Sequence, residues 1–348
     1  MNADVSGMEE RIRAHALKAG ASFIGFAPVT AYPEYIQEVA RRIADRHIVV
    51  EDYLSPAKNG GFPGLYADPR GTLPSARSVV LVGVNAFDDA CSYTAARGEL
   101  RGKIARTYAY YPVIRKIAET VAALLRDDLG FEAVQSQNFP LKITAARMGL
   151  GSYGENGVIL TRDYGSFVAL SGVLTSASLA SESSPPEDFC LHCGKCRMAC
   201  PTGALYEPYK VDPSLCVNAV ARKSAEIPGH LRRKIGAWFR GCDICQDVCP
   251  RNHALVPRAA DLRCGYDPAS HTSHAFLNDM ERLPRLMPLL EPDRPPLIRR
   301  NAAIVLGNIG RGQPELLQAL RSHAGKEKGE LKDVMMWALA ENESRDRD

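Results

Sequence analysis

Residues 190–201 read CLHCGKCRMACP, so four cysteines follow one another at spacings of two, two and three residues before a proline. Residues 242–250 read CDICQDVCP and end on a second Cys-Pro pair, and Cys216 lies between the two runs. Together they hold eight of the ten cysteines, and we assign no role to the other two, Cys91 and Cys264. Cysteines gathered at ligand-like spacing in a chain without an export signal predict metal or redox chemistry rather than disulfides.

The first run matches the bacterial ferredoxin pattern, in which the fourth cysteine ligates the other of two clusters. On this rule one 4Fe–4S cluster is bound by Cys190, Cys193, Cys196 and Cys249, and the other by Cys200, Cys216, Cys242 and Cys245. A pair of zinc sites is the alternative, but a zinc ribbon does not require the third cysteine or the Cys-Pro endings. The interleaved ligands predict an electron relay, although clusters also hold small modules together.

Composition excludes several other classes of protein. The 348 residues include 43 Lys+Arg and 40 Asp+Glu, a net charge of +3, and 45% are hydrophobic. This is ordinary for a globular protein and excludes disordered, collagen-like and membrane-bundle chains. The small net charge means that any nucleic-acid contact must come from a local patch. Because the N-terminus has no apolar export segment and the longest uncharged run is too polar to span a bilayer, we expect a cytoplasmic protein with no membrane association.

We expect an α+β protein in three parts. Residues 1–185 read as a mixed α/β domain, with a helix over 8–20, strands in 22–29, 76–87 and 157–175, and an amphipathic helix over 111–125 that has Pro112 in its first turn. A polar, proline-containing stretch then leads into the two-cluster module, residues 186–260. Residues 261–348 contain three short helical patterns broken by glycine and resemble a HEAT-like tail.

A glycine-rich loop, residues 149–154, reads GLGSYG and matches the dinucleotide fingerprint literally. We reject that interpretation because the preceding residues, 143–148, read as a helix rather than a strand. The loop can still bring backbone N–H groups close to a large cofactor, so its candidate binding residues are Gly149, Leu150, Gly151, Ser152 and Gly154. The alternative is that Gly149 only caps the preceding helix.

Several stretches resemble the epoxyqueuosine reductases, which act on tRNA in the last step of queuosine synthesis. These are GALYEPYKVDPSLC (203–216) and GCDICQDVCPRN (241–252) in the cysteine module, with 145–175 and 68–87 upstream and LIRRNAAIVLGNIG (297–310) downstream. The same family resembles the reductive dehalogenases, which usually carry an export leader and lack the helical tail. The chain is therefore more similar to the first group.

The resemblance implies a nitroreductase-like α/β domain that binds cobalamin. The clusters would take electrons from a low-potential donor such as flavodoxin or ferredoxin and reduce the cobalt to Co(I). That species would attack, or pass electrons to, the epoxide-bearing ring of the modified base, and loss of the oxygen as water would need a proton donor. The tail and a basic surface would hold the tRNA.

The chain departs from the family where the proton donor is expected. The family has an aspartate in a segment of the form D-S-A-P, whereas residues 135–140 here read QSQNFP. Alignment on the proline puts Gln137 at that place and ungapped counting puts Gln135 near it, and an amide cannot cycle a proton at neutral pH. Tyr108, Tyr110 and Tyr111 are the other candidates, with packing as the alternative.

Glu155 is a further candidate acid, although a loop carboxylate is more often solvated. Basic residues of the second half could neutralise tRNA phosphates; the set is Arg222, Lys223, Arg232, Arg233, Lys234, Arg299 and Arg300. Trp238 or Phe239 could stack on a base. The alternative is a solvated helix face with both rings buried.

Three functions follow from these observations. The first is a cobalamin- and iron–sulfur-dependent oxidoreductase that reduces epoxyqueuosine to queuosine in tRNA. The second keeps both cofactors but reduces a small molecule, which the missing aspartate favours. The third is an electron-transfer protein that reduces a partner's corrinoid or flavin.

Overall fold

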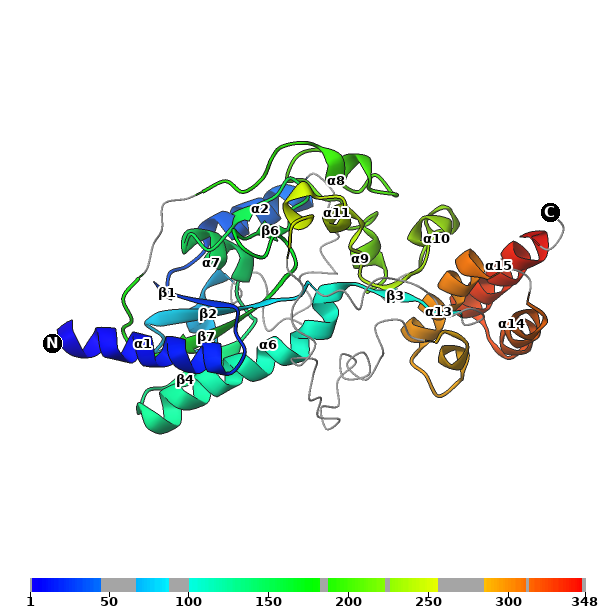
Figure 1. Cartoon of the computed structure of the whole chain (residues 1–348). Coiled ribbons are helices and arrows are strands. Elements are labelled where there is room, and N and C mark those ends of the chain that lie inside the picture. The colour runs from blue at the N-terminus through cyan, green and yellow to red at the C-terminus, as the bar shows by residue number, and fades with distance from the viewer. Residues whose placement is uncertain are drawn as a thin grey trace.

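A four-stranded antiparallel sheet is the centre of the N-terminal half (Figure 1). The strands lie in the order β1 (Phe23–Pro28), β2 (Ser78–Asn85), β7 (Val168–Thr175) and β4 (Ala133–Ser136). The computed structural model describes residues 2–44, 67–87, 100–181, 187–222, 226–255, 285–310 and 313–345. Cys91, Cys264 and Lys223 lie outside the described residues.

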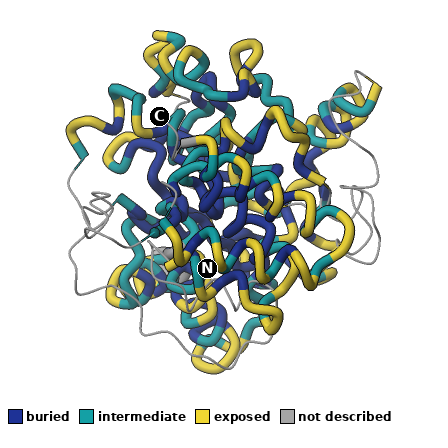
Figure 2. Tube along the Cα trace, turned by 90° about the vertical axis from the view of Figure 1, so that its right-hand side faces the viewer, coloured by how far each residue is buried: buried dark blue, intermediate teal, exposed yellow. Residues whose placement is uncertain are grey.

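Both faces of the sheet are covered, which explains the continuous apolar run of β2. Val80 and Val82 pack on the side of the helices α1 (Asn2–Lys18) and α6 (Arg106–Ala123). Val79 and Leu81 alternate to the other side, where α7 (Leu141–Arg147) lies. The buried residues accordingly gather in the middle of the molecule in Figure 2. The strand predictions for 22–29, 76–87 and 157–175 are confirmed in position.

Helix α6 begins five residues before the predicted start, so Pro112 lies inside the helix and the placement in its first turn is wrong. The reason lies far away in the sequence. The Oδ2 atom of Asp243 accepts a hydrogen bond of 2.8 Å from the backbone N–H of Arg106 and so caps the first turn. No local pattern around residue 106 reveals that acceptor.

The second half packs around a core of its own. Its elements are α8 (Lys195–Met198), α9 (Val217–Val220), α10 (Gly229–Ile235), β8 (Trp238–Arg240), α11 (Ile244–Asp247), α13 (Pro296–Ile309), α14 (Pro314–Lys326) and α15 (Gly329–Arg345). The last three confirm the predicted tail helices. One apolar core joins them to the module, with Phe239, Ile298 and Val334 among its buried members. The cysteine module and the tail are therefore packed as one body.

One connection ties that body to the N-terminal half of the chain, and another holds its two parts together. Strand β3 (Lys103–Ile104), which leads into α6, pairs parallel with β8 of the module. Asn301 of α13 donates to the carbonyl oxygens of Ala221 (2.9 Å) and Phe239 (3.0 Å), so the tail helix satisfies the module's backbone directly.

Shorter elements complete the described chain. They are α2 (Pro33–Ala44), β5 (Ser152–Tyr153), β6 (Ile159–Leu160), the π-turn Leu124–Asp128, and the 3-10 turns Pro69–Gly71, Pro250–Asn252 and Met287–Leu290. Within the described ranges, no helix is both long and apolar enough to cross a bilayer.

Candidate active site

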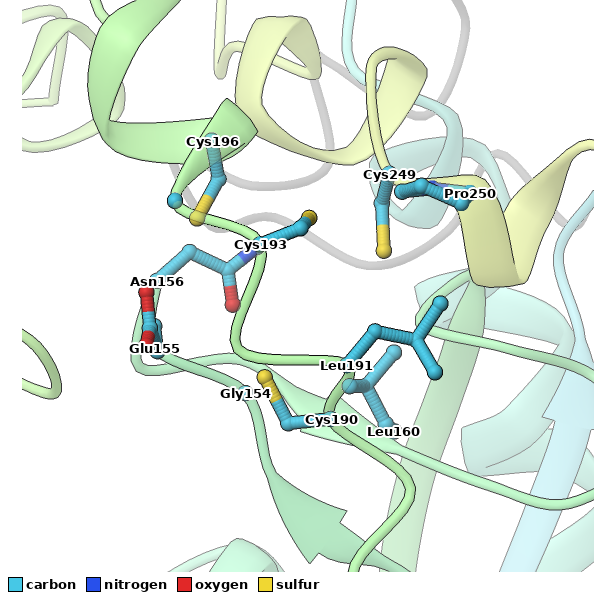
Figure 3. A pocket seen from close by; sticks show the side chains of 11 residues that line it. Gly154, Glu155, Asn156, Leu160, Cys190, Leu191, Cys193, Cys196, Cys249 and Pro250 are labelled. Carbon is cyan, nitrogen blue, oxygen red and sulfur yellow. The ribbon is translucent and has the colours of Figure 1, made fainter.

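One open cavity is lined by Cys190, Cys193, Cys196 and Cys249. These four thiols come from the first run and from the end of the second run, and they surround one space in Figure 3. They are the four residues that the ferredoxin rule assigns to one cluster. The grouping therefore matches the set expected from the spacing.

Local backbone geometry turns the cysteines toward this space. Gly194 has a left-handed φ of 68° and starts α8, so the chain reverses between Cys193 and Cys196. Cys249 ends the turn of α11 just before Pro250, the first residue of a 3-10 turn. Arg251 Nε then donates to the carbonyl oxygen of Phe189 at 2.7 Å, which holds the two runs against each other.

The remaining four cysteines influence one another electrostatically. Burial raises the pKa of Cys242 to about 12, and the nearby Cys216 and Cys200 thiols add to the rise. Burial also raises the pKa of Cys245 well above its usual value, and Cys242 and Cys216 add to it. Such thiols become thiolates when a metal ion binds, because a coordinating thiol is deprotonated outright. Cys200, Cys216, Cys242 and Cys245 therefore form a second set.

The two sets lie near each other, since Cys196 of the first set also raises the pKa of Cys245, after burial and the nearer thiols. Helices α8 and α11, which carry these two cysteines, pack together. All eight cysteines of the module are free thiols. The arrangement suits transfer of an electron between two clusters, one bound by each set of cysteines.

Glu155 lies against the first set, so its interpretation as a solvated loop charge is wrong. Its residue exposure is 7%, and it lines the same cavity as the cysteines. Its carboxylate faces Arg197 Nε and His192 Nδ1, each at 3.5 Å. The Cys-rich loop folds over the loop that carries Glu155, and that contact between distant segments could not be read from the sequence.

The N-terminal half of α6 brings three polar side chains to one face near the second set. Tyr108, Tyr111 and Arg115 follow one another at spacings of three and four, which places them on one side of a helix. The Tyr108 hydroxyl donates 2.9 Å to Oδ1 of Asn218, two residues after Cys216. Burial raises the pKa of Tyr108, against the lowering effect of the guanidinium groups of Arg222 and Arg240.

Tyr111 packs edge-on against Tyr108, with ring centroids 5.4 Å apart, and keeps 36% of its surface exposed. Tyr110 points to another face of α6 and is 3% exposed in the core beneath the sheet. Tyr110 is therefore a packing residue in this structure.

Gln137 directly follows the end of β4 and is bound by Arg115 of α6. Its Oε1 accepts hydrogen bonds from Arg115, at 3.1 Å from Nη2 and 3.3 Å from Nε. Gln135 lies within β4 and donates 3.0 Å to Ser171 Oγ on the neighbouring strand. Of the two glutamines, Gln137 is thus the one that contacts α6, through Arg115. Sequence reasoning missed Arg115 and Asn218, although the helical spacing could have indicated Arg115.

The conformation of the glycine-rich loop is fixed by contacts within the protein. Gly149, at φ 70°, ends α7: its N–H bonds to the oxygen of Ala146, and that of Leu150 bonds to Ala145. A Cβ on Gly151 would lie 2.6 Å from the oxygen of Leu160. The capping interpretation of Gly149 is confirmed.

The other two loop residues also face protein atoms. A Cβ on Gly154 would lie 2.8 Å from Asn156 Oδ1. Ser152 Oγ accepts a hydrogen bond from the N–H of Phe189 at the start of the cysteine module. These contacts position the loop beside the first cysteine set.

Three residues of the predicted basic surface are buried, so their interpretation as tRNA-facing cations is wrong. Arg232, Arg299 and Arg300 are 6%, 5% and 3% exposed. Arg232 donates to the carbonyl of Ile227 and Arg299 to that of Leu290, so each satisfies backbone inside the shared core. Their long side chains stabilise the junction between the module and the tail.

The remaining cations of that set within the described residues are exposed: Arg222, Arg233 and Lys234. Arg233 pairs with Glu341 of α15. Trp238 and Phe239 are 5% and 0% exposed, so the stacking interpretation is wrong and both rings are core residues.

A sheet domain joined to a module with two adjacent sets of four cysteines defines an iron–sulfur oxidoreductase. The family model described as a 4Fe-4S double cluster binding domain matches residues 189–252, which contain all eight cysteines of the module. The chain belongs to the epoxyqueuosine reductase family.

Three curated relatives carry that name. The Synechococcus sp. protein is 30% identical over 268 residues, spanning 73% of this chain and 79% of its own length. The Synechocystis sp. protein is 34% identical over 199 residues, spanning 54% and 66%. The Bacillus subtilis protein is 27% identical over 375 residues, spanning 94% of each.

Solved structures show the same fold. One is the Bacillus subtilis epoxyqueuosine reductase with its catalytic aspartate loop swung out of the active site, with a TM-score of 0.70, 24% identity and coverage of 97% and 99%. Another is an epoxyqueuosine reductase with an epoxyqueuosine-modified tRNA-Tyr stem loop, with a TM-score of 0.70, 23% identity and coverage of 97% and 100%.

Proposed function

We propose that this chain reduces epoxyqueuosine in tRNA to queuosine, with electrons carried by two 4Fe–4S clusters to a cobalamin. The observation that carries the proposal is the contact of Tyr108 of α6 with Asn218, two residues after Cys216 of the second cysteine set, in a member of this family. The reaction converts an epoxide to an alkene, so it consumes two electrons and two protons and releases the oxygen as water. The chain must therefore conduct electrons and deliver protons.

The cluster ligands follow the two sets. One cluster would be held by Cys190, Cys193, Cys196 and Cys249, and the other by Cys200, Cys216, Cys242 and Cys245. The cavity lined by the first four thiols and the mutual pKa effects of the others support this division. The first cluster is the more exposed, so it would receive electrons, and the second would pass them toward Tyr108.

Cobalamin would bind beside the second cluster, against the N-terminal half of α6 and the end of β4. The side chains there are hydroxyl, amide and guanidinium groups, which suit the amide side chains that surround a corrin ring. When bound, the reduced corrinoid supplies the low-potential electrons that remove the epoxide oxygen. The glycine-rich loop would contribute only through backbone, because its glycines already face protein atoms.

Proton delivery differs from a carboxylate-based scheme. Arg115 holds the oxygen of Gln137, which leaves the amide NH2 to donate a hydrogen bond without giving up a proton. Tyr108 is an ionisable group on the same face of α6 as Arg115, two turns earlier, and its raised pKa keeps it protonated at neutral pH. Gln137 would therefore position the substrate and Tyr108 would supply the proton.

The three-part organisation is part of the proposal. Residues 1–185 would form a nitroreductase-like cobalamin domain, 186–260 the two-cluster module and 261–348 a HEAT-like tail. The exposed Arg222, Arg233 and Lys234 would contact tRNA phosphates. The chain would act in the cytoplasm, supplied by a carrier such as flavodoxin or ferredoxin.

The test is anaerobic reconstitution with iron, sulfide and cobalamin, followed by a low-potential reductant and epoxyqueuosine-containing tRNA. Mass spectrometry of the nucleosides should show queuosine. Tyr108→Phe should lower turnover about 100-fold or more with unchanged iron and cobalamin, because a general acid is lost. Tyr110→Phe, from the buried face of the same helix, is the matched control.

The other outcomes separate the alternatives. If cobalamin binds and is reduced but the nucleoside is unchanged, the enzyme acts on another substrate. If no cobalamin is retained, the chain is an electron-transfer protein. Equal loss in both tyrosine variants would assign the effect of Tyr108 to packing.

A further inference from the structure

Four large apolar side chains are exposed on the cysteine module between residues 191 and 209, and we call them the apolar patch. It consists of Leu191, Met198, Tyr206 and Tyr209, which are 52%, 77%, 37% and 41% exposed. The other large apolar side chains exposed within the described ranges lie on α1, α2, α6 and α15. Large apolar side chains left exposed in one segment of a module can mark a site of interaction.

The patch covers the part of the molecule nearest the first cysteine set. Cys193 is the one exposed cysteine of the module, and Leu191 lines the cavity with the four thiols (Figure 3). Helix α8, which carries Met198, lies at the periphery of the molecule in Figure 1. Because electron tunnelling weakens steeply with distance, a donor bound here would reach the first cluster by the shortest path.

Two exposed cations near the first cysteine set have no carboxylate partner in the described part of the chain. Of the other charged groups there, Asp188 pairs with His192 and Glu207 pairs with Lys210. Lys195 is exposed and forms no ion pair with any residue in the described part of the chain.

The second of these cations is Arg251. It is exposed, and its Nε binds a backbone carbonyl rather than a carboxylate. Lys195 and Arg251 thus offer two cationic contacts to an acidic partner.

We propose that this patch is the docking surface for an acidic one-electron carrier protein. The proposal rests on the proposed function and adds the place where electrons arrive. Each docking oxidises the carrier by one electron and reduces the first cluster by one, and two dockings supply one epoxide reduction. A small patch with exposed Met and aromatic side chains suits a brief contact, as in other electron-transfer encounters.

The test uses the holoprotein and follows cluster bleaching after rapid mixing with reduced flavodoxin, with no tRNA present. Met198→Glu and Lys195→Glu should each lower the second-order rate about tenfold. Reduction by dithionite, which needs no docking surface, should stay within twofold. Met336→Glu, at an exposed position on α15, is the matched control.

The results decide between distinct outcomes. Unchanged flavodoxin rates in both variants, or an equal loss in the Met336→Glu control, would overturn the proposal. A parallel loss with dithionite would attribute the effect to the cluster and also count against the docking surface. Because the measured quantity is cluster reduction, this test of the docking surface remains valid even if the chain fails to convert epoxyqueuosine.

Discussion

Replacing Asp243 by alanine should destabilise the protein more than any surface change. The side chain is fully buried and accepts three hydrogen bonds, from Arg106 N–H (2.8 Å), Arg106 Nη1 (3.2 Å) and Gln246 Nε2 (2.9 Å). Loss of a buried acceptor costs about 1 kcal/mol for each neutral donor and about 2 for a charged one. The sum is about 4 kcal/mol, of which the helix cap on α6 is about 1.

Two further variants separate the effect of the helix cap from that of the ion pairs of Arg106. Asp243→Asn keeps one acceptor oxygen for the cap but loses the ion pair, so we expect a loss of about 2 kcal/mol. Asp247→Ala removes the other partner of Arg106, at 2.6 Å, but that carboxylate is 37% exposed. A half-exposed ion pair is worth about 1 kcal/mol or less.

The assay is thermal unfolding of the reconstituted protein by circular dichroism at one scan rate. At about 2–4 °C per kcal/mol, alanine should lower the midpoint by about 8 °C or more, asparagine by about half as much, and Asp247→Ala by about 2 °C. Epoxyqueuosine turnover should fall in the same order, since α6 carries Tyr108. If Asp243→Ala melts within 2 °C of the parent chain, or no lower than Asp247→Ala, the cap does not hold α6 to the module.

Three other changes test the fold and the site. Gly172→Val should abolish soluble expression, because even a Cβ there would lie 2.2 Å from the ring of Phe139, whereas soluble yield equal to the parent would contradict that packing. Asn301→Ala should lower the free energy of unfolding by about 2 kcal/mol through two lost hydrogen bonds, and an unchanged thermal midpoint would contradict its role in joining tail to module. Cys242→Ser should lower the bound iron by about half while the first cluster keeps its electron paramagnetic resonance signal, and full iron content would refute its assignment as a ligand.

Patterns that depend on neighbouring residues in the chain could be predicted. The cysteine spacing implied the grouping of Cys190, Cys193, Cys196 and Cys249, because a fixed number of residues wraps a cluster of fixed size. The strands and the tail helices followed from the periodicity of their apolar residues.

Features that depend on distant segments could not be predicted. Arg299 and Arg300 looked like surface cations because charge is usually exposed, yet backbone carbonyls from other segments accept their hydrogen bonds. Glu155 was expected in solvent, and the cysteine loop covers it. The early start of α6 depended on an acceptor 137 residues away.

The pairing of β3 with β8 bears on how the chain can be divided for engineering. A fragment cut at residues 186 and 260 would contain every cluster ligand but would leave β8 without Lys103 and Ile104 as its neighbours. An unprotected strand edge of this kind recruits other chains and promotes aggregation. Such a fragment would also expose the apolar face on which α13 rests. A soluble minimal cluster protein would therefore need residues from three separate stretches of the sequence, joined by new linkers.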